Sequence, residues 1–277
     1  MISAKSDLDF VPGSPRIAYE RAGSGPVVVF LHGIGGNRSN WADQCGALAD
    51  RFTTVAWDAR GYGASADYPG DLEFSEFGDD LNRLLDWLEV ETAHLVGLSM
   101  GGRILLDFQP RYADRIATLT LCDTHFGFET ALSEEKRAEF LRLRQQPLLE
   151  GKSFADLAPA LLDSLLGPNC GVDARERLEE SLLELRKESY LKTLAASIYF
   201  DASNDLSDID VPVLLIYGEF DRLTSPEIGR QLEDRIRDAR LEIIPDAGHL
   251  SNLEQPDRFN AVLGPFLDTH ADRATKL

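Results

Sequence analysis

The chain has 277 residues, of which 43% are hydrophobic, and a formal net charge of -19 at pH 7. This length and apolar content predict one large α/β domain with an insertion rather than two independent cores. The strong negative charge argues against nucleic acid or an anionic membrane surface as a partner. Because there is no apolar run of about 18 residues and the polar N-terminus has no signal-peptide core, we expect a cytoplasmic protein.

Strand and helix patterns alternate along the first part of the chain. Short apolar runs predict strands near residues 16–21, at 27–31 and at 52–57, and helical periodicity predicts helices at 40–49 and 76–89. Such alternation is typical of a mostly parallel central sheet with helices on both faces. We therefore predict the α/β class for the chain.

A glycine-rich loop follows the strand at 27–31 and spans residues 32–37 (HGIGGN). It contains neither Gly-Lys-Ser/Thr nor the Gly-x-Gly-x-x-Gly pattern, which argues against a nucleotide site. The cysteines are too few and too scattered for a disulfide framework or a zinc site; they are Cys45, Cys122 and Cys170. We therefore expect neither a metal nor an organic cofactor.

A serine lies between glycines at residues 97–101 (GLSMG), after an apolar run at 92–96 and before a helical pattern at 101–108. A sharp turn between strand and helix lifts such a serine out of the sheet edge, and its small neighbours allow strand and helix to approach closely. The N-terminus of the helix favours a negatively charged oxygen at this place. A serine between glycines is also a common flexible turn, but this context predicts a nucleophilic Ser99.

Two later strands are followed by the partners that a serine nucleophile needs. Asp221 follows the apolar run at 211–217, and His249 follows the run at 239–244. A serine hydroxyl becomes nucleophilic when a neutral imidazole takes its proton and a carboxylate fixes the imidazole. Since serine, acid and histidine occur in the expected order, we predict Asp221 as the orienting acid and His249 as the base.

Other carboxylates compete for the role of the acid. Glu219 lies in the same loop as Asp221, and Asp123 follows another strand at 116–122 and is the second choice. Asp221 could also simply cap the helix that begins near Ser225. We prefer Asp221 because the next strand then delivers the histidine.

The negative oxygen that forms when the serine attacks a carbonyl needs hydrogen-bond donors. We predict that the backbone N–H of Ile34, in the glycine-rich loop, joins the N–H of Met100 in pointing at this oxygen. Because both donors are backbone groups, replacement of either side chain is expected to leave these hydrogen bonds intact.

The chain changes character after the strand at 116–122 and is helical in pattern from about 125 to 201. Ser133 opens one segment as a capping residue, and breaks are expected at Pro147, Gly151, Pro159 and residues 167–168. We predict a helical cap at 125–201 inserted into an α/β core that consists of residues 1–124 and 202–277.

Helices laid over the strand ends would exclude water and shape a pocket. Leu178, Leu182 and Leu185 recur at helical spacing and predict one buried face of the cap. Six apolar residues are candidates for the pocket lining, although most are expected to serve in ordinary packing: Phe126, Phe128, Leu161, Leu165, Tyr199 and Phe200.

Five segments resemble those of the α/β-hydrolase superfamily in order and spacing: residues 32–33 (HG), 58–65 (DARGYGAS), 97–102 (GLSMGG), 218–221 (GEFD) and 248–249 (GH). The tail at 247–256 is most similar to the 3-oxoadipate enol-lactonase-like branch. The resemblance implies an α/β-hydrolase fold and five roles: Ser99 as nucleophile, His249 as base, Asp221 as its orienter, and the Ile34 and Met100 amides as the oxyanion hole. A serine at position 99 argues against the superfamily's haloalkane dehalogenases and epoxide hydrolases, which use an aspartate there.

These residues together predict the hydrolysis of a small-molecule ester or lactone through an acyl-Ser99 intermediate. Two interpretations stay open beside it: C–C bond hydrolysis or cofactor-free perhydrolysis on the same residues, and a weakly catalytic ligand sensor. The net charge favours a neutral substrate unless the pocket supplies a cation, for which Arg60, Arg103 and Arg222 are candidates. A homodimer also stays open.

Overall fold

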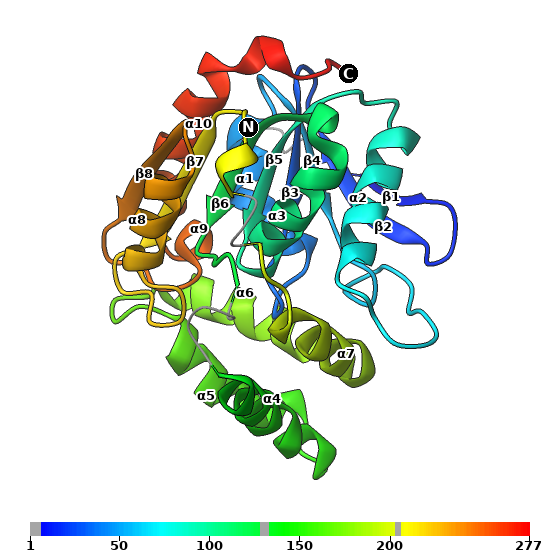
Figure 1. Cartoon of the computed structure of the whole chain (residues 1–277), viewed down its shortest axis with the longest axis vertical. Helices are drawn as coiled ribbons and strands as arrows, with labels where there is room; N and C mark the ends of the chain where they lie inside the picture. Colours follow the sequence, from blue (N-terminus) through cyan, green and yellow to red (C-terminus); the bar gives the residue numbers. More distant parts are fainter. Residues whose placement is uncertain (1–6, 128–132, 203–205) are drawn as a thin grey trace.

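The computed structural model describes residues 7–127, 133–202 and 206–277. Within them, an eight-stranded sheet has the order β1-β2-β4-β3-β5-β6-β7-β8 (Figure 1). The strands are β1 (Asp7–Val11), β2 (Ile17–Ala22), β3 (Val27–Leu31), β4 (Thr53–Trp57), β5 (Ala93–Leu98), β6 (Ile116–Cys122), β7 (Val213–Gly218) and β8 (Ala239–Ile244). From β4 to β8 all neighbours are parallel, whereas β2 is antiparallel to both β1 and β4. The predicted mostly parallel sheet is confirmed.

Side chains of the central strands alternate between two apolar layers. In β3, Val27, Val29 and Leu31 join the cluster on one face, and Val28 and Phe30 join the cluster on the other. Successive side chains of a strand point to opposite faces of a sheet. Because both faces are covered, β3 is apolar at every position, which is typical of a buried parallel strand.

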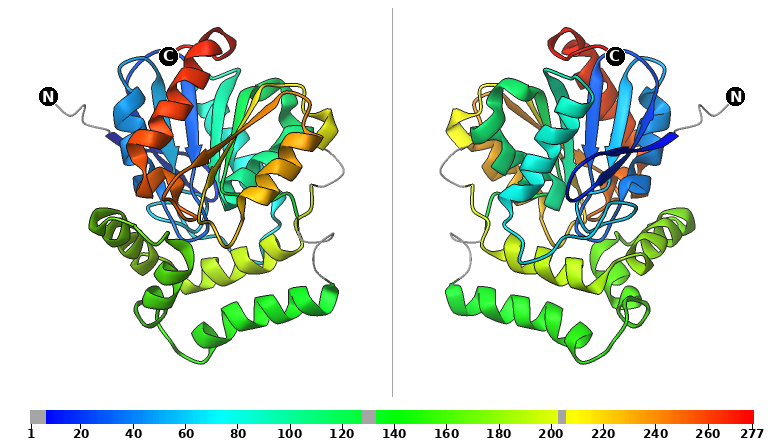
Figure 2. Two further views of the ribbon diagram at one scale, coloured as in Figure 1. Left: turned by 90° about the vertical axis from the view of Figure 1, so that its left-hand side faces the viewer. Right: turned by 90° about the vertical axis from the view of Figure 1, so that its right-hand side faces the viewer.

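Helices cover both faces of the sheet, as predicted (Figure 2). On one side α2 packs against α3 and α8 lies over β7 and β8, and on the other side α1 packs against α10. The helices of these layers are α1 (Ala42–Leu48), α2 (Ser75–Trp87), α3 (Met100–Tyr112), α8 (Pro226–Arg235), α9 (Ser251–Glu254) and α10 (Pro256–Thr269). Short 3₁₀ turns occur at η1 (Arg38–Trp41), η2 (Ala113–Arg115), η3 (Leu206–Asp208) and η4 (Ala271–Arg273).

The order of the strands places a crevice at their carboxyl ends. After β3 the chain forms β4, which pairs with one edge of β3, and it then returns to form β5, which pairs with the opposite edge of β3. Ligand sites of open parallel sheets collect at such a reversal, outside the carboxyl ends of the strands. The loops that follow β3 and β5 are therefore the expected floor of a site.

In the described part of the segment between β6 and β7, four α-helices lie beyond this edge of the sheet, apart from the two covering layers (Figure 2). They are α4 (Glu134–Leu149), α5 (Phe154–Leu165), α6 (Val172–Leu183) and α7 (Lys187–Ile198). The Ser133 side chain caps α4 by accepting a hydrogen bond from the N–H of Lys136, as predicted. In the described residues no helix has both the length and the apolar character that a membrane span requires.

The expected helix breaks at Pro147 and Pro159 are wrong, because α4 and α5 continue through them. A proline inside a helix removes one N–H donor and disturbs the turn before it. Pro147 lies close to the end of α4, and the start of α5 is held by a capping box between Ser153 and Asp156. Pro147 therefore disturbs only the end of α4, whereas Pro159 lies inside α5 and removes one N–H donor there.

Candidate active site

Ser99 occupies a strained turn between β5 and α3. Its backbone has φ 52° and ψ -108°, a conformation that residues other than glycine rarely adopt. Such a backbone costs about 1–3 kcal/mol and persists where its surroundings hold it. The Ser99 N–H donates to the carbonyl of Cys122 at 2.8 Å, and the Thr124 hydroxyl donates to the Ser99 carbonyl at 2.6 Å. Strand β6 and the residues after it therefore hold the turn in place.

Two glycines allow this turn to form. A Cβ on Gly97 would lie 2.4 Å from the carbonyl carbon of Gly101, and a Cβ on Gly101 would lie 2.3 Å from the carbonyl oxygen of Leu31. Both obstacles are backbone atoms, which cannot move aside as a side chain can. The predicted close approach of strand and helix is thus confirmed at these two positions.

The structure brings Ser99, His249 and Asp221 together in one hydrogen-bonded line. His249 Nε2 lies 2.9 Å from Ser99 Oγ, and His249 Nδ1 lies 2.8 Å from Asp221 Oδ2. His249 and Asp221 are buried, with 4% and 3% of their surface exposed, whereas Ser99 is partly exposed. The hydroxyl is thus the end of the line that a ligand can reach.

The Asp221 carboxylate accepts hydrogen bonds at both oxygens. Oδ1 accepts from the N–H groups of Leu223 and Thr224 at 2.8 and 2.9 Å, and Oδ2 accepts from the Thr224 hydroxyl at 2.6 Å and faces His249. Burial alone would raise the pKa of Asp221, but the charge of His249 and these hydrogen bonds lower it below its usual value. The alternative in which Asp221 caps α8 is wrong, since no side chain caps that helix.

The competing carboxylates lie elsewhere. Asp123 is fully buried, with Oδ1 accepting from the Gly218 N–H at 2.7 Å and Oδ2 accepting from the Ser251 hydroxyl at 2.5 Å. Burial and the nearby charge of Asp221 raise the pKa of Asp123 well above its usual value. Glu219 is exposed and accepts from the backbone of Asp246 at 3.1 Å. Of the three carboxylates considered, Asp221 is the one hydrogen-bonded to the imidazole.

A buried histidine fixes the glycine-rich loop after β3. His32 Nδ1 lies 2.8 Å from the carbonyl oxygen of Gly33, and His32 Nε2 accepts the N–H of Ala59 at 3.0 Å. Burial lowers the pKa of His32, although its bond to Gly33 and the charge of Asp58 oppose this shift. A neutral ring with its proton on Nδ1 satisfies both contacts. The loop is thus tied to the turn that follows β4.

The two predicted oxyanion donors flank Ser99. A Cβ on Gly33 would lie 3.4 Å from Ser99 Cβ, which brings the loop with Ile34 next to the serine. Met100 is the first residue of α3. Within the described residues neither the Ile34 N–H nor the Met100 N–H is bonded to a backbone acceptor. Both groups thus lie beside Ser99 without a backbone partner among the described residues.

A small cavity of about 60 Å³ lies above Ser99 and His249. Its volume is smaller than that of common ligand pockets, which is about 300–1,000 Å³. Of the predicted lining residues, Leu161 and Leu165 face it, together with Leu178 and Leu182. The other candidates lie elsewhere: Phe126 and Phe200 belong to the core, Tyr199 is exposed, and Phe128 lies outside the described residues.

The three candidate arginines do not line this cavity. Arg60 is paired with Asp80 at 2.6 Å, and Arg103 is buried and donates to the carbonyl of Ser197 at 3.3 Å. Arg144 of α4 lines the cavity instead, with its guanidinium 4.7 Å from the centroid of the Phe140 ring. The positive charge at the cavity therefore comes from the helical insertion.

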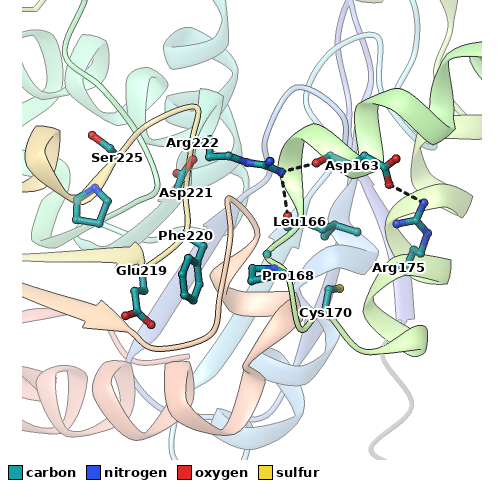
Figure 3. Close-up of a pocket in the computed structure, with 12 residues that line it drawn as sticks. Asp163, Leu166, Pro168, Cys170, Arg175, Glu219, Phe220, Asp221, Arg222 and Ser225 are labelled. Carbon is teal, nitrogen blue, oxygen red and sulfur yellow. Dashed lines mark hydrogen bonds and ion pairs between the residues drawn. The ribbon is translucent and has the colours of Figure 1, made fainter.

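Arg222 lies in a separate groove of about 710 Å³ beside Asp221 (Figure 3). It donates to the carbonyl oxygens of Asp163 and Leu166, and the Asp163 side chain pairs with Arg175 at 3.0 Å. The groove thus runs between the loop after β7 and the connection from α5 to α6. Arg222 holds these two segments together.

Three residues at the site were not assigned a role from the sequence. Thr224 bonds to Asp221 and its Oγ1 lies 3.1 Å from His249 Nδ1, Glu254 contacts the loop of His249, and Arg144 lines the cavity. The pattern Asp-x-x-Thr is a signal for a turn in which the hydroxyl meets the carboxylate. For Arg144 no local signal exists, because only the packing of the insertion places it. Among the described residues no group of three or more His, Cys, Asp or Glu could hold a metal.

Comparison with known proteins identifies the family of this chain. The family described as alpha/beta hydrolase fold matches residues 26–256. The 3-oxoadipate enol-lactonase 2 of Acinetobacter baylyi is 28% identical over 236 residues, which are 85% of this chain and 86% of that protein. The structure of a thermophilic esterase from Thermogutta terrifontis has a TM-score of 0.85 and 29% identity, and covers 96% of this chain and 100% of its own.

The enol-lactonase from Burkholderia xenovorans has a similar structure, with a TM-score of 0.80 and 28% identity over 95% of this chain and 100% of its own. The family match extends from just before β3 to the first residue of α10 and thus includes Ser99, Asp221 and His249. The predicted fold and family are confirmed. This chain belongs to the alpha/beta hydrolase fold family.

Proposed function

We propose that the protein hydrolyses a small-molecule ester or lactone, with Ser99 as the nucleophile. The observation that carries the proposal is the hydrogen-bonded line from Ser99 through His249 to Asp221, with contacts of 2.9 and 2.8 Å. The esterase and the enol-lactonases to which the chain is similar support the same class of reaction. A metal or an organic cofactor has no part in this chemistry.

In the first step His249 Nε2 takes the proton of Ser99 while the serine oxygen attacks the carbonyl carbon of the substrate. The carbonyl oxygen becomes negative, and the N–H groups of Ile34 and Met100 bind it. Each such donor accelerates the reaction about 100- to 1,000-fold. Asp221 accepts a hydrogen bond from the Nδ1–H of His249, which keeps Nε2 free to act as a base and stabilises the imidazolium.

In the second step the tetrahedral intermediate collapses and expels an alkoxide, which takes the proton from the imidazolium. His249 then removes a proton from water, which attacks the acyl-Ser99 ester and releases the acid. In a lactone the alcohol stays attached to the acyl group, so that one hydroxy acid is released at the end. The serine and the imidazole return to their starting forms.

We further propose that residues 125–201 act as a cap over a core of residues 1–124 and 202–277. Side chains of α5, α6 and α7 form one wall of the cavity and shield the serine from water, for example Leu161, Leu182 and Tyr190. The cavity is small, with a volume of about 60 Å³. The cavity therefore favours a short acyl group.

The proposal is tested with a panel of esters, lactones and vinylogous diketones and with the Ser99→Ala variant as the blank. We expect rapid turnover of short p-nitrophenyl esters or lactones, stoichiometric labelling of Ser99 by a fluorophosphonate, and no turnover by the variant. Equal hydrolysis by Ser99→Ala would overturn the proposal. Cleavage of diketones alone would favour C–C hydrolysis, and a single slow turnover with a large ligand-induced rise in Tm would favour a sensor.

A further inference from the structure

Three consecutive backbone N–H groups around His249 are hydrogen-bonded. Gly248 and Leu250 donate to Glu254 Oε1 at 2.9 and 3.3 Å, and His249 itself donates to the carbonyl of Leu165 at 2.7 Å. Leu165 is the last residue of α5 in the helical insertion. One carboxylate oxygen and one carbonyl thus hold the backbone that carries the imidazole.

The other oxygen of Glu254 reaches the insertion. Glu254 Oε2 accepts the N–H of Gly167 at 2.7 Å, and 8% of the Glu254 surface is exposed. The two loops touch through their backbones, since a Cβ on Gly167 would lie 2.8 Å from the Gly248 nitrogen. Burial raises the pKa of Glu254, although the three N–H groups and the charge of His249 oppose this shift. The side chain therefore joins the histidine loop to the α5–α6 connection.

We propose that Glu254 is a positioning residue, which locks the loop of His249 against the α5–α6 connection and so keeps the imidazole within reach of Ser99. This inference rests on the proposed function. Hydrogen bonds to a carboxylate are stronger than those between neutral groups, and a buried site strengthens them further. A shift of about 1 Å in a reacting group can slow an enzyme about 100-fold.

A role for Glu254 in merely capping a helix does not explain these contacts. Glu254 is the last residue of the short helix α9, where carbonyl groups rather than N–H groups lack partners. The N–H groups that it binds belong to residues before α9 and to Gly167, which lies 87 positions away in the sequence. The bond to Leu250 reaches the N-cap of α9, but the bonds to Gly248 and Gly167 lie outside this helix, so the carboxylate also acts between segments.

The Glu254→Gln variant tests the hydrogen bonds of the Glu254 carboxylate, because glutamine has nearly the same shape as glutamate. Gln has one acceptor oxygen and one NH2 group, so that at least one of the backbone N–H groups faces a donor in either orientation. We expect kcat to fall about 10- to 100-fold, with KM nearly unchanged. The pH profile of kcat/KM is also expected to change, because the variant replaces a carboxylate beside the histidine loop with a neutral amide.

Glu233→Gln is the matched control. Glu233 is an exposed glutamate of α8 that also accepts a backbone N–H, that of Leu241 at 2.9 Å. We expect it to leave kcat and the pH profile as in the unmodified enzyme. A second variant, Gly167→Ala, pushes the loops apart from the side of the insertion without replacing Glu254 or any of the three reacting residues. It is expected to lower kcat in the same direction as Glu254→Gln.

Two readouts keep the outcomes separate. The first is steady-state kinetics with a short p-nitrophenyl ester, and the second is the low-field proton resonance of the His249 Nδ1–H beside Asp221. Loss of kcat together with a shifted or broadened resonance in both variants supports the proposal. Normal kcat, pH profile and resonance in either folded variant overturn it. If the unmodified protein lacks ester turnover and fluorophosphonate labelling, the proposed function fails, and the resonance alone then decides the role of Glu254.

Discussion

Replacement of Asp221 by asparagine tests the hydrogen-bonded line at a single atom. Oδ1 of Asp221 accepts two backbone N–H groups at 2.8 and 2.9 Å, while Oδ2 faces His249 Nδ1 at 2.8 Å. The amide oxygen of asparagine takes the Oδ1 position, because an NH2 group there would face two donors. The NH2 group then lies opposite His249 Nδ1 and donates to it.

This arrangement moves the proton of the neutral imidazole from Nδ1 to Nε2. When Nδ1 accepts a hydrogen bond, the proton of the neutral ring must lie on Nε2, where it points at Ser99 Oγ. The serine then has no base, and we expect kcat/KM to fall about 10⁴-fold. This factor corresponds to about 5 kcal/mol in the activation free energy. The asparagine has the same shape as the aspartate, so that the fold is expected to persist.

The assay measures kcat/KM on a short p-nitrophenyl ester, the rate of labelling by a fluorophosphonate, and Tm for the unmodified protein, Asp221→Asn and Asp123→Asn. We expect both rates to collapse in Asp221→Asn alone, since Asp123 bonds to Gly218 and Ser251 and not to the imidazole. A loss of less than tenfold in folded Asp221→Asn, with collapse in folded Asp123→Asn, would refute this assignment of the acid.

Two other predictions concern charge and pH. Arg144 lines the cavity, so we expect Arg144→Gln to lower kcat/KM about tenfold for an ester that carries a carboxylate and to leave kcat/KM unchanged for a matched neutral ester. The control is Arg142→Gln on the same helix, because Arg142 pairs with Glu139 at 2.7 Å. Equal losses of kcat/KM for both esters would contradict the prediction. Burial, together with nearby positive charges, lowers the pKa of His94 from 6.5 to about 4, so that between these values the unfolded chain binds a proton that the folded chain does not. The free energy of unfolding therefore falls as pH drops from about 6.5 to 4, by up to about 3 kcal/mol from this group. Urea unfolding across this range should show a smaller loss of unfolding free energy for His94→Gln than for the unmodified protein. An equal loss in both proteins would argue against this role of His94.

Local patterns predicted much of the fold. The strands at 27–31 and 239–244 have the predicted bounds, because runs of apolar residues with turn residues behind them mark a strand by themselves. Ser99 was found in the same way, since a serine with glycines on both sides fits a strained strand-to-helix turn. By contrast, β1 is a short edge strand with two aspartates, which forms by pairing with β2 and carries a weak pattern.

The partners at the site depend on contacts between distant segments. Order along the chain made Asp221 the preferred acid but left Asp123 as an alternative, because both residues follow strands whose ends meet at the same edge of the sheet. Distances decide between them. The roles of Arg144 and Glu254 are seen only in the folded chain, because packing of the insertion places Arg144 at the cavity and Gly167 against the Glu254 carboxylate.

Periodicity, turn residues and the order of chemical groups are properties of neighbouring residues, and they were sufficient for the class of fold, for the helical pattern between β6 and β7, and for Ser99 and His249 as candidates. The choice of the carboxylate, the size and charge of the cavity and the lock on the histidine loop arise where residues far apart in the chain pack together. Packing depends on the shape and burial of both partners at once, and no stretch of neighbouring residues records it.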